Sequence, residues 1–267
     1  SALGNLFLLG IIASIIIGLF AAYLKDSFDN TFKDENDIKL EFDLPLLTDI
    51  PSIKGNDIFE KFENYDNSSK ILETDSRDNN YREPFVELVT AINFLNSEKI
   101  KIFSITSFLN SEGKTLMNIF LAKTLAKIGF KVLIVDLNLR FPKIHNILSI
   151  KNEFGLSNLL IDEKLKLEKV IKDFNLNNND SFKVLTSGSN ISEPIKLLNS
   201  PKFIEFSEDL RNNKKFDYVI FDMPAINGLS DFNLIAQYCD KLILLITLKQ
   251  VQKKFSLMNS IKFEDIR

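Results

Sequence analysis

The most distinctive hydrophobic pattern lies at the start of the chain. Residues 1–24 carry no charged side chain and consist mainly of Leu, Ile, Ala, Phe and Gly. As a helix they would extend about 36 Å, and the hydrocarbon core of a bilayer is about 30 Å thick. The stretch lacks the basic n-region of a secretory signal peptide. We therefore predict a transmembrane helix over 1–24, with a buried helix of a soluble protein as the alternative.

Residues 25–80 follow a polar pattern without a regular period. Two stretches of mixed charge, 25–43 and 63–80, flank a short apolar patch at 44–55 that contains Pro45 and Pro51. Such a composition is typical of a solvated connection. We predict a polar cytoplasmic linker over 25–80 with one docking spot.

From residue 81 onward the pattern changes to alternating helices and strands. One predicted helical face carries five apolar residues and follows Pro84 in the first turn: Phe85, Leu88, Val89, Ile92 and Leu95. Continuous apolar runs predict strands at 100–106, 131–136, 182–186, 217–222 and 241–247. A helix over 115–128 should end before Gly129, a residue suited to a left-handed cap. This order predicts a three-layer α/β domain with a mainly parallel sheet.

A candidate phosphate-binding loop joins the first strand to the 115–128 helix. The segment ITSFLNSEGKTL, residues 105–116, contains Gly113, Lys114 and Thr115. In this position Gly113 allows close backbone approach to a phosphate, Lys114 reaches the β- and γ-phosphates, and the Thr115 hydroxyl binds magnesium. Phe108 stands where the usual motif has its first glycine. The strand–loop–helix context nevertheless predicts phosphate binding.

Two aspartates close predicted strands of the same sheet. Asp136 ends the run KVLIV, and Asp222 ends DYVIF. A single such residue would be expected to cap the following turn. Because ligands of parallel sheets bind at the carboxyl ends of the strands, we instead expect both to face the bound nucleotide and its metal.

Three motifs in order resemble those of the bacterial tyrosine kinases of capsular and exopolysaccharide synthesis. They are S-x3-S-E-G-K-T at 107–115, V-D-x-N-x-R-x-P-x-x-H at 135–145, and F-D-M-P at 221–224. The segments GLSNLL, SGSNISEPIKLLNSPKF and LSDFNLIA also resemble that family. Upstream, the apolar helix, DNT at 29–31 and LLTDIP resemble the end of the chain-length determinant (polysaccharide co-polymerase) region fused to such kinases.

The resemblance implies a P-loop NTPase-like tyrosine kinase domain over 81–267, incomplete at its C-terminus, that uses ATP and Mg²⁺. It implies phosphate binding by Ser111, Glu112, Gly113, Lys114, Thr115 and Leu116. It further implies that Asp136 accepts the tyrosine proton, that Asp222 holds the metal and that Arg140 belongs to the second motif. The implied metal ligands are Thr115, Asp136, Asn138 and Asp222. His145 matches a family position but is expected to be structural, and Cys239 is expected to be a core thiol.

The resemblance also implies a location and partners. The chain would lie at the bacterial inner (plasma) membrane, with its kinase-like domain in the cytoplasm. Its partners would be the polysaccharide polymerisation and export machinery and protein tyrosine substrates. The family's oligomerisation helix carries E-x2-R-x2-R. Here Glu83 remains while Val86 and Val89 replace both arginines, so self-association is left open.

Composition excludes several other classes of function. The net charge is −3, which gives no electrostatic reason to expect nucleic acid as a partner. A single cysteine excludes an internal disulfide framework, and a single histidine argues against a His-rich zinc site.

Two alternatives to a tyrosine kinase remain. Asn138 replaces the second acid of the family's D-x-D-x-R motif, Ala225 replaces the second proline of its D-x-P-P motif, and no tyrosine follows Tyr238. These departures favour an ATP-binding regulator of polysaccharide chain length with weak or no kinase activity. A partition- or septum-type ATPase is the third reading, but Leu109 stands where those proteins carry a signature lysine.

Overall fold

The computed structural model describes residues 2–27, 31–42, 44–51, 79–94, 100–176, 180–227, 230–248 and 251. The chain divides into two compact units. One consists of residues 1–44 and 247–260, and the other of residues 45–246 and 261–267.

In the residues that the structure describes, the smaller unit contains two helices, α1 (Ala2–Ser27) and α2 (Glu35–Phe42). The side chain of Asp34 accepts a hydrogen bond from the Asp37 amide (3.0 Å), which caps the start of α2. Phe32 is fully buried, and its ring centroid lies 5.7 Å from that of Phe42. Within the predicted polar linker, residues 35–42 therefore form a short helix, which a side-chain cap and an aromatic contact stabilise. Residues 52–78 of the linker lie outside the described part of the chain.

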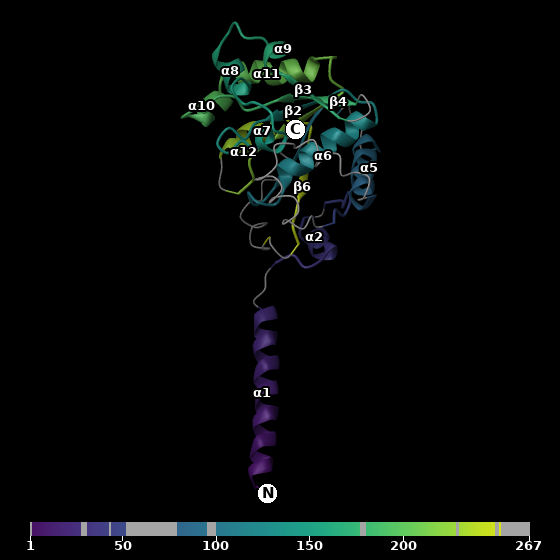
Figure 1. The fold of residues 1–267 in the computed structure, drawn as a ribbon, viewed down its shortest axis with the longest axis vertical. Helices are drawn as coiled ribbons and strands as arrows, with labels where there is room; N and C mark the ends of the chain where they lie inside the picture. Colours follow the sequence, from purple (N-terminus) through teal and green to yellow (C-terminus); the bar gives the residue numbers. More distant parts are fainter. Residues whose placement is uncertain are drawn as a thin grey trace. The chain divides into compact units, whose positions relative to one another are not determined.

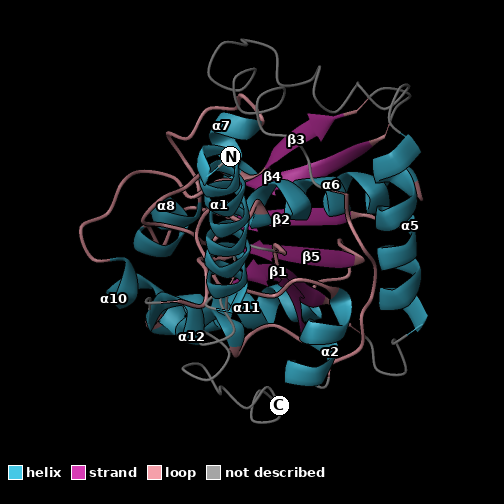
Figure 2. Cartoon of the chain, turned by 90° about the horizontal axis from the view of Figure 1, so that it is seen from below, coloured by secondary structure: helices cyan, strands magenta, loops and turns pink. Residues whose placement is uncertain are grey.

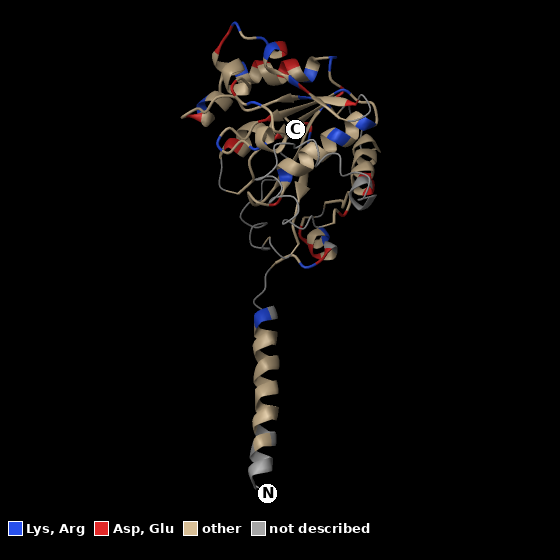
Figure 3. Ribbon diagram, in the orientation of Figure 1, with Lys and Arg blue, Asp and Glu red and all other residues tan. Residues whose placement is uncertain are grey.

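Helix α1 confirms the helical part of the N-terminal prediction. Its body carries no charged side chain before Lys25 (Figure 3). Many of its large apolar side chains are exposed, among them Phe7, Ile17 and Phe20. Across the described residues, however, no helix combines the length and the apolarity needed to cross a membrane. The predicted membrane crossing is therefore not found in the described part of the chain; Ser1 and the side chains of residues 2–6, 8, 9, 26 and 27 lie outside the description.

The larger unit is built on one six-stranded sheet in its described part, in the order β3-β4-β2-β5-β1-β6. Five strands match the predicted ones and pair in parallel: β1 (Ile102–Ser107), β2 (Val132–Asp136), β4 (Ser181–Leu185), β5 (Tyr218–Asp222) and β6 (Lys241–Leu245). The sixth, β3 (Lys172–Asn175), pairs antiparallel with β4 at the edge. It was not predicted because only Phe174 of its four residues is buried, so the segment has no apolar run.

Hydrogen bonds join β2 and β5 just before their first residues as well as along their length. The Asp217 amide donates to the Lys131 carbonyl (2.8 Å), and the Lys131 amide donates to the Asp217 carboxylate (2.7 Å). From there the strands run in register until Asp136 pairs with Asp222. Every residue of both strands is buried, as expected for strands covered on both faces.

Helices cover both faces of this sheet. On one side α6 (Lys114–Lys127) contacts β1, β2, β4 and β5, and α5 (Asn79–Phe94) packs against α6. Figure 1 shows α11 (Pro201–Asn212) on the other side, and Figure 2 shows the strands in order between the helices. The remaining helices are α7 (Ile144–Ile147), α8 (Leu156–Ile161), α9 (Leu167–Val170), α10 (Pro194–Leu198) and α12 (Ser230–Ala236). The predicted three-layer α/β arrangement is confirmed.

Helix α5 confirms the predicted apolar face but not its start. Its residues Phe85, Leu88, Val89 and Ile92 are buried in the core, and Leu95 lies outside the described residues. Because α5 begins at Asn79, Pro84 is inside the helix rather than in its first turn, so one backbone hydrogen bond is lost there. Val89 is only 3% exposed, which excludes a surface role for this position in self-association. At the end of α6, Gly129 adopts φ +102° and confirms the predicted left-handed cap.

Candidate functional site

The loop between β1 and α6 presents backbone N–H groups where a phosphate would bind. Gly113, directly before α6, has φ 87° and ψ 8°, a left-handed conformation that favours glycine. No side chain caps this helix end, so its first amides are available to an anion. Lys114, Thr115 and Leu116 follow as buried residues of the first turn.

The loop holds its shape through its own side chains. The Ser107 hydroxyl donates to the Leu109 carbonyl (2.7 Å), and the Leu109 amide donates to the Glu112 carboxylate (2.7 Å). Phe108 is 2% exposed, and its φ is not positive. A bulky residue therefore fits where the usual motif has glycine, because the left-handed turn occurs at Gly113 instead. Ser111 lies at the exposed tip beside Glu112.

Asp136 and Asp222 stand side by side at the carboxyl ends of β2 and β5. They are register partners, and both side chains are fully buried. The Asp136 carboxylate accepts from the amides of Asn138 (3.2 Å) and Ile144 (3.3 Å). Asp222 accepts from the side chain of Asn118 (2.9 Å) through Oδ1. Its Oδ2 has no hydrogen-bond partner in the described part of the protein, which leaves a buried carboxylate oxygen open to a cation.

Burial and proximity change the acidity of these groups. Burial, and then the charge of Asp222, raise the pKa of Asp136 well above its usual value. Burial also raises the pKa of Asp222, against the opposing effects of Asn118, Thr115 and Lys114. Burial lowers the pKa of Lys114, and the charge of Asp222 partly restores it. Asp222 therefore lies within electrostatic range of both Asp136 and Lys114.

Asn118, which was not among the predicted site residues, connects these parts. Its side chain accepts from the Ile105 amide (3.0 Å) and donates to the Ile105 carbonyl (3.1 Å) as well as to Asp222. The pairing of β1 with β5 ends at Phe103, so Asn118 satisfies backbone groups of β1 beyond that point. Asn118 lies four residues after Lys114 and therefore on the same helical face, a spacing that could have indicated its place in the site.

The second motif forms a structured turn after β2. The Asn138 side-chain oxygen accepts from the Phe141 amide (3.3 Å), so this residue stabilises the turn. Arg140 forms a two-point ion pair with Asp231 at the start of α12, through Nε (2.6 Å) and Nη2 (3.2 Å). Arg140 therefore connects the turn after β2 to α12, and its charge is paired with that of Asp231. Asp231 was not predicted, since only its place in LSDFNLIA pointed to it.

Side-chain hydrogen bonds join two loops, at residues 152–158 and 188–189, near the carboxyl end of β4, the strand beside β2. The Asn152 side chain donates to the Gly188 carbonyl (3.0 Å) and accepts from its amide (2.9 Å). Asn158 accepts from the Gly155 amide (3.0 Å) and donates to the Ser189 hydroxyl (3.0 Å). These bonds give the sheet edge beside Asp136 a fixed shape.

The residues present fit a magnesium ion that is held jointly with phosphates. No group of three or more His, Cys, Asp or Glu side chains suited to a metal occurs among the described residues. Mg²⁺ needs fewer protein ligands, because it usually takes one or two carboxylates together with phosphate oxygens and water. The unpartnered Oδ2 of Asp222, beside Thr115, matches this requirement. The Asn138 oxygen, already bonded to Phe141, is the weaker of the predicted ligands.

The two other residues singled out in the sequence take no part in this site's hydrogen bonds. Cys239 is buried, and burial raises the pKa of its thiol far above the usual range, in keeping with a core thiol. His145 lies in α7, and burial together with the charge of Lys172 lowers its pKa. Its Nδ1 is buried without a hydrogen-bond partner among the described residues, so the expectation of a fully hydrogen-bonded structural histidine is not met.

Comparison with known proteins decides the family. Residues 100–262 match the AAA domain family. Tyrosine-protein kinase CpsD of Streptococcus pneumoniae serotype 4 is 33% identical over 161 residues, covering 60% of this chain and 68% of CpsD. The chain belongs to the family of bacterial tyrosine-protein kinases.

Two further relatives show how far the similarity to this kinase family extends. Tyrosine-protein kinase Ptk of Acinetobacter johnsonii is 28% identical over 239 residues, covering 88% of this chain but only 31% of Ptk. The kinase domain of Escherichia coli tyrosine kinase ETK superposes with a TM-score of 0.73 at 24% identity, covering 87% of this chain and 90% of that domain. The second similarity confirms the P-loop NTPase-like fold of the kinase family.

Proposed function

We propose that this chain transfers the γ-phosphate of ATP to tyrosine residues of proteins, its own included, and so regulates capsular or exopolysaccharide synthesis and export. The observation that carries the proposal is the pairing of Asp136 with Asp222 at one sheet edge, where Asp222 lies within electrostatic range of Lys114. Kinship with tyrosine-protein kinases supports the choice of tyrosine as acceptor.

The chemistry assigns a separate task to each group. The amides at the start of α6 and the Lys114 ammonium bind the triphosphate. The tyrosine hydroxyl oxygen forms a bond to the γ-phosphorus, the bond from that phosphorus to the bridging oxygen of ADP breaks, and the tyrosine proton passes to Asp136. A raised pKa suits Asp136 to this role, because it brings a carboxylate closer to the working pH of a base. Thr115 and Asp222 would hold Mg²⁺, which when bound neutralises charge on the phosphates.

Replacing Lys114 tests this proposal directly. We expect Lys114→Met to reduce magnesium-dependent labelling of tyrosine to below about 1% of wild type, since both phosphate binding and charge neutralisation are lost. Transfer of labelled γ-phosphate to the chain and to a tyrosine-rich peptide is the measurement. Lys169→Met, at an exposed lysine of α9, is the matched control and should leave labelling unchanged. Unchanged labelling in Lys114→Met would refute the assignment.

An ATP-binding regulator with weak or no kinase activity is the second candidate, favoured by Asn138. The neutral amide brings no charge to the metal, and its oxygen is already bonded to the Phe141 amide. In this case ATP binding would alter polysaccharide chain length without phosphorylating tyrosine.

Restoring an acid at position 138 separates the two candidates. An aspartate preserves the acceptor for the Phe141 amide, so we expect Asn138→Asp to fold and to lower the Mg²⁺ concentration for half-maximal transfer by about tenfold. Asn146→Asp, on the exposed surface of α7, controls for the added charge. If ATP binds to wild type and variant but neither labels tyrosine, the regulator is the correct reading.

We also propose that residues 1–24 attach the chain to the inner membrane, with the kinase-like domain in the cytoplasm beside the polysaccharide polymerisation and export machinery. The uncharged, apolar composition of the stretch supports this proposal. Membrane fractionation of the chain with and without residues 1–24 tests the attachment. Self-association would not use Val89, which is buried.

A further inference from the structure

The segment after the second motif returns to the buried acid at the end of β2. The Ile144 amide donates to Asp136 Oδ2 (3.3 Å), and the amide of Lys143 also interacts favourably with this carboxylate. The backbone of Lys143 is thereby held next to Asp136. The side chain of Lys143 is exposed, so it starts from a fixed point at the rim of the site.

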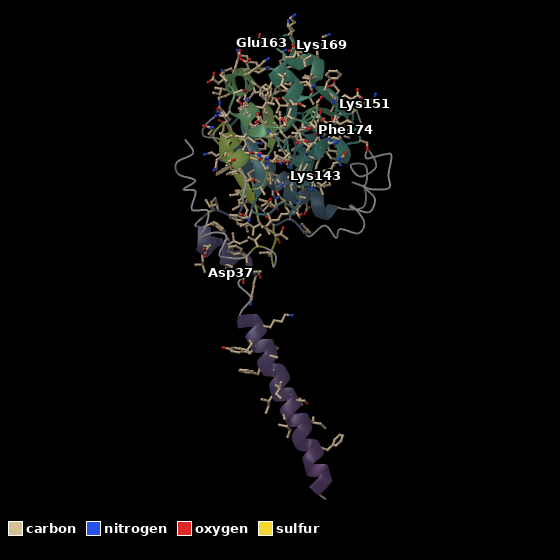
Figure 4. All side chains as sticks on the ribbon, turned by 90° about the vertical axis from the view of Figure 1, so that its left-hand side faces the viewer. Asp37, Lys143, Lys151, Glu163, Lys169 and Phe174 are labelled. Carbon is tan, nitrogen blue, oxygen red and sulfur yellow. The ribbon has the colours of Figure 1, made fainter. Side chains whose placement is uncertain are left out.

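The ammonium of Lys143 forms no ion pair with any residue that the structure describes. Its positive charge nevertheless reaches into the site, because it lowers the pKa of both Lys114 and Asp222. Figure 4 labels Lys143 within the body of the larger unit. An unpaired cation close to the reacting groups is available to bind a negatively charged ligand.

The arrangement of the site determines which part of the nucleotide would meet this cation. The start of α6 and Lys114, which would bind the triphosphate, follow β1 on one side of β5, whereas Lys143 follows β2 on the other side. A base at Asp136 has to lie near the oxygen that attacks the γ-phosphorus. The terminal phosphate would therefore lie between Lys114 and Lys143, with the α- and β-phosphates farther from Lys143.

We propose that Lys143 contacts the γ-phosphate of ATP and so distinguishes ATP from ADP at this site. This inference rests on the proposed function. It adds a second cation opposite Lys114, in a site where Asn138 contributes no negative charge. Lysine suits this position because its compact charge on a flexible stem can follow the phosphate as it transfers.

The test compares affinity for two nucleotides rather than activity. Mg²⁺ with a non-hydrolysable ATP analogue, and Mg²⁺ with ADP, are titrated against the full chain as wild type, Lys143→Ala and Lys143→Arg. We expect Lys143→Ala to weaken binding of the ATP analogue about tenfold, which is the low end for the loss of one charge-assisted hydrogen bond. The affinity for ADP should change less than twofold. Lys143→Arg should retain most of the affinity for the analogue.

Lys169→Ala is the matched control, since this exposed lysine of α9 should leave both affinities unchanged; it is labelled in Figure 4. Equal losses for both nucleotides, or no loss in Lys143→Ala, would overturn the role of Lys143 while leaving the proposed kinase intact. Failure of the wild type to bind either nucleotide would overturn the proposed function as well. Unfolding temperatures of all variants should agree, because the side chain of Lys143 is exposed.

Discussion

The Asp222→Asn variant is expected to be more stable than the wild type without nucleotide, yet to lose nearly all phosphoryl transfer. The asparagine oxygen keeps the hydrogen bond from Asn118, and its amide group can face the Thr115 hydroxyl. The buried charge disappears, which should raise the unfolding temperature by about 2–4 °C, the effect of about 1 kcal/mol in a domain of this size. Transfer should fall roughly 100- to 1,000-fold, because the carboxylate that would hold the metal is lost.

The same reasoning gives the pH dependence of wild-type stability. Burial raises the pKa of Asp222 in the folded chain above about 3.9, the value in the unfolded chain. The folded protein therefore binds more protons than the unfolded one between these two pKa values. Its free energy of unfolding should fall as pH rises from about 4 through the folded pKa. Asp222→Asn should reduce this fall, as thermal unfolding at a series of pH values will show.

The control for Asp222→Asn lies at the other end of the same strand. Asp217→Asn makes the same chemical change at an exposed site and keeps an acceptor for the Lys131 amide. It should alter neither stability nor transfer. A loss of stability in Asp222→Asn would contradict this expectation and show that the carboxylate is stabilising in the absence of a metal. Full transfer by that variant would exclude Asp222 as a metal ligand.

The largest loss of stability is expected from Gly155→Ala. A Cβ atom at this position would lie 2.2 Å from the Thr186 carbonyl oxygen and 2.5 Å from the Gly188 nitrogen, both backbone atoms. These atoms cannot move aside without breaking the hydrogen bonds that join the two loops, because the Thr186 carbonyl accepts from the Leu156 amide and the Gly188 amide donates to the Asn152 side chain. We expect a loss of about 3–5 kcal/mol and an unfolding temperature lower by about 10 °C. Thermal denaturation followed by circular dichroism measures both.

Gly129→Ala provides the matched control. At this residue φ is +102°, but a Cβ atom would meet nothing within 4 Å. The substitution therefore adds only left-handed strain, for which about 1 kcal/mol is expected. If Gly129→Ala destabilised the protein as much as Gly155→Ala, crowding between the two loops would not be the cause.

The fold was predictable where burial imposes a simple pattern. Strands β2 and β5 are covered on both faces, so their sequences are continuous apolar runs that end in an acid. β3 escaped prediction because an edge strand needs few apolar residues; its Lys172 and Asp173 indicate no strand. α2 escaped for a similar reason, since its stability comes from the Asp34 cap and from the contact between the rings of Phe32 and Phe42 rather than from an apolar run.

The parts of the site that lie at the strand ends and in the phosphate loop could be predicted from the sequence. Asp136 and Asp222 were expected to meet, because parallel strands end at one edge, and they do. Asn118, Asp231 and Lys143 were missed. The proximity of Asp231 and Lys143 to the site depends on how the chain turns back after each strand, which no local pattern of residues encodes. Asn118 differs, because its spacing of four residues from Lys114 within α6 was a local signal.

The hydrogen bonds between Lys131 and Asp217, which align the starts of β2 and β5, limit the changes in length that these two strands can tolerate. Asp136 lies as many residues after Lys131 as Asp222 lies after Asp217. The two carboxylates are therefore side by side at the carboxyl edge of the sheet. Losing one residue from either strand would turn its acid onto the opposite layer. Losing two would draw it back by roughly 6.6 Å. Length variation should therefore be tolerated in the connections but not inside these strands, a constraint that libraries of deletion variants would expose.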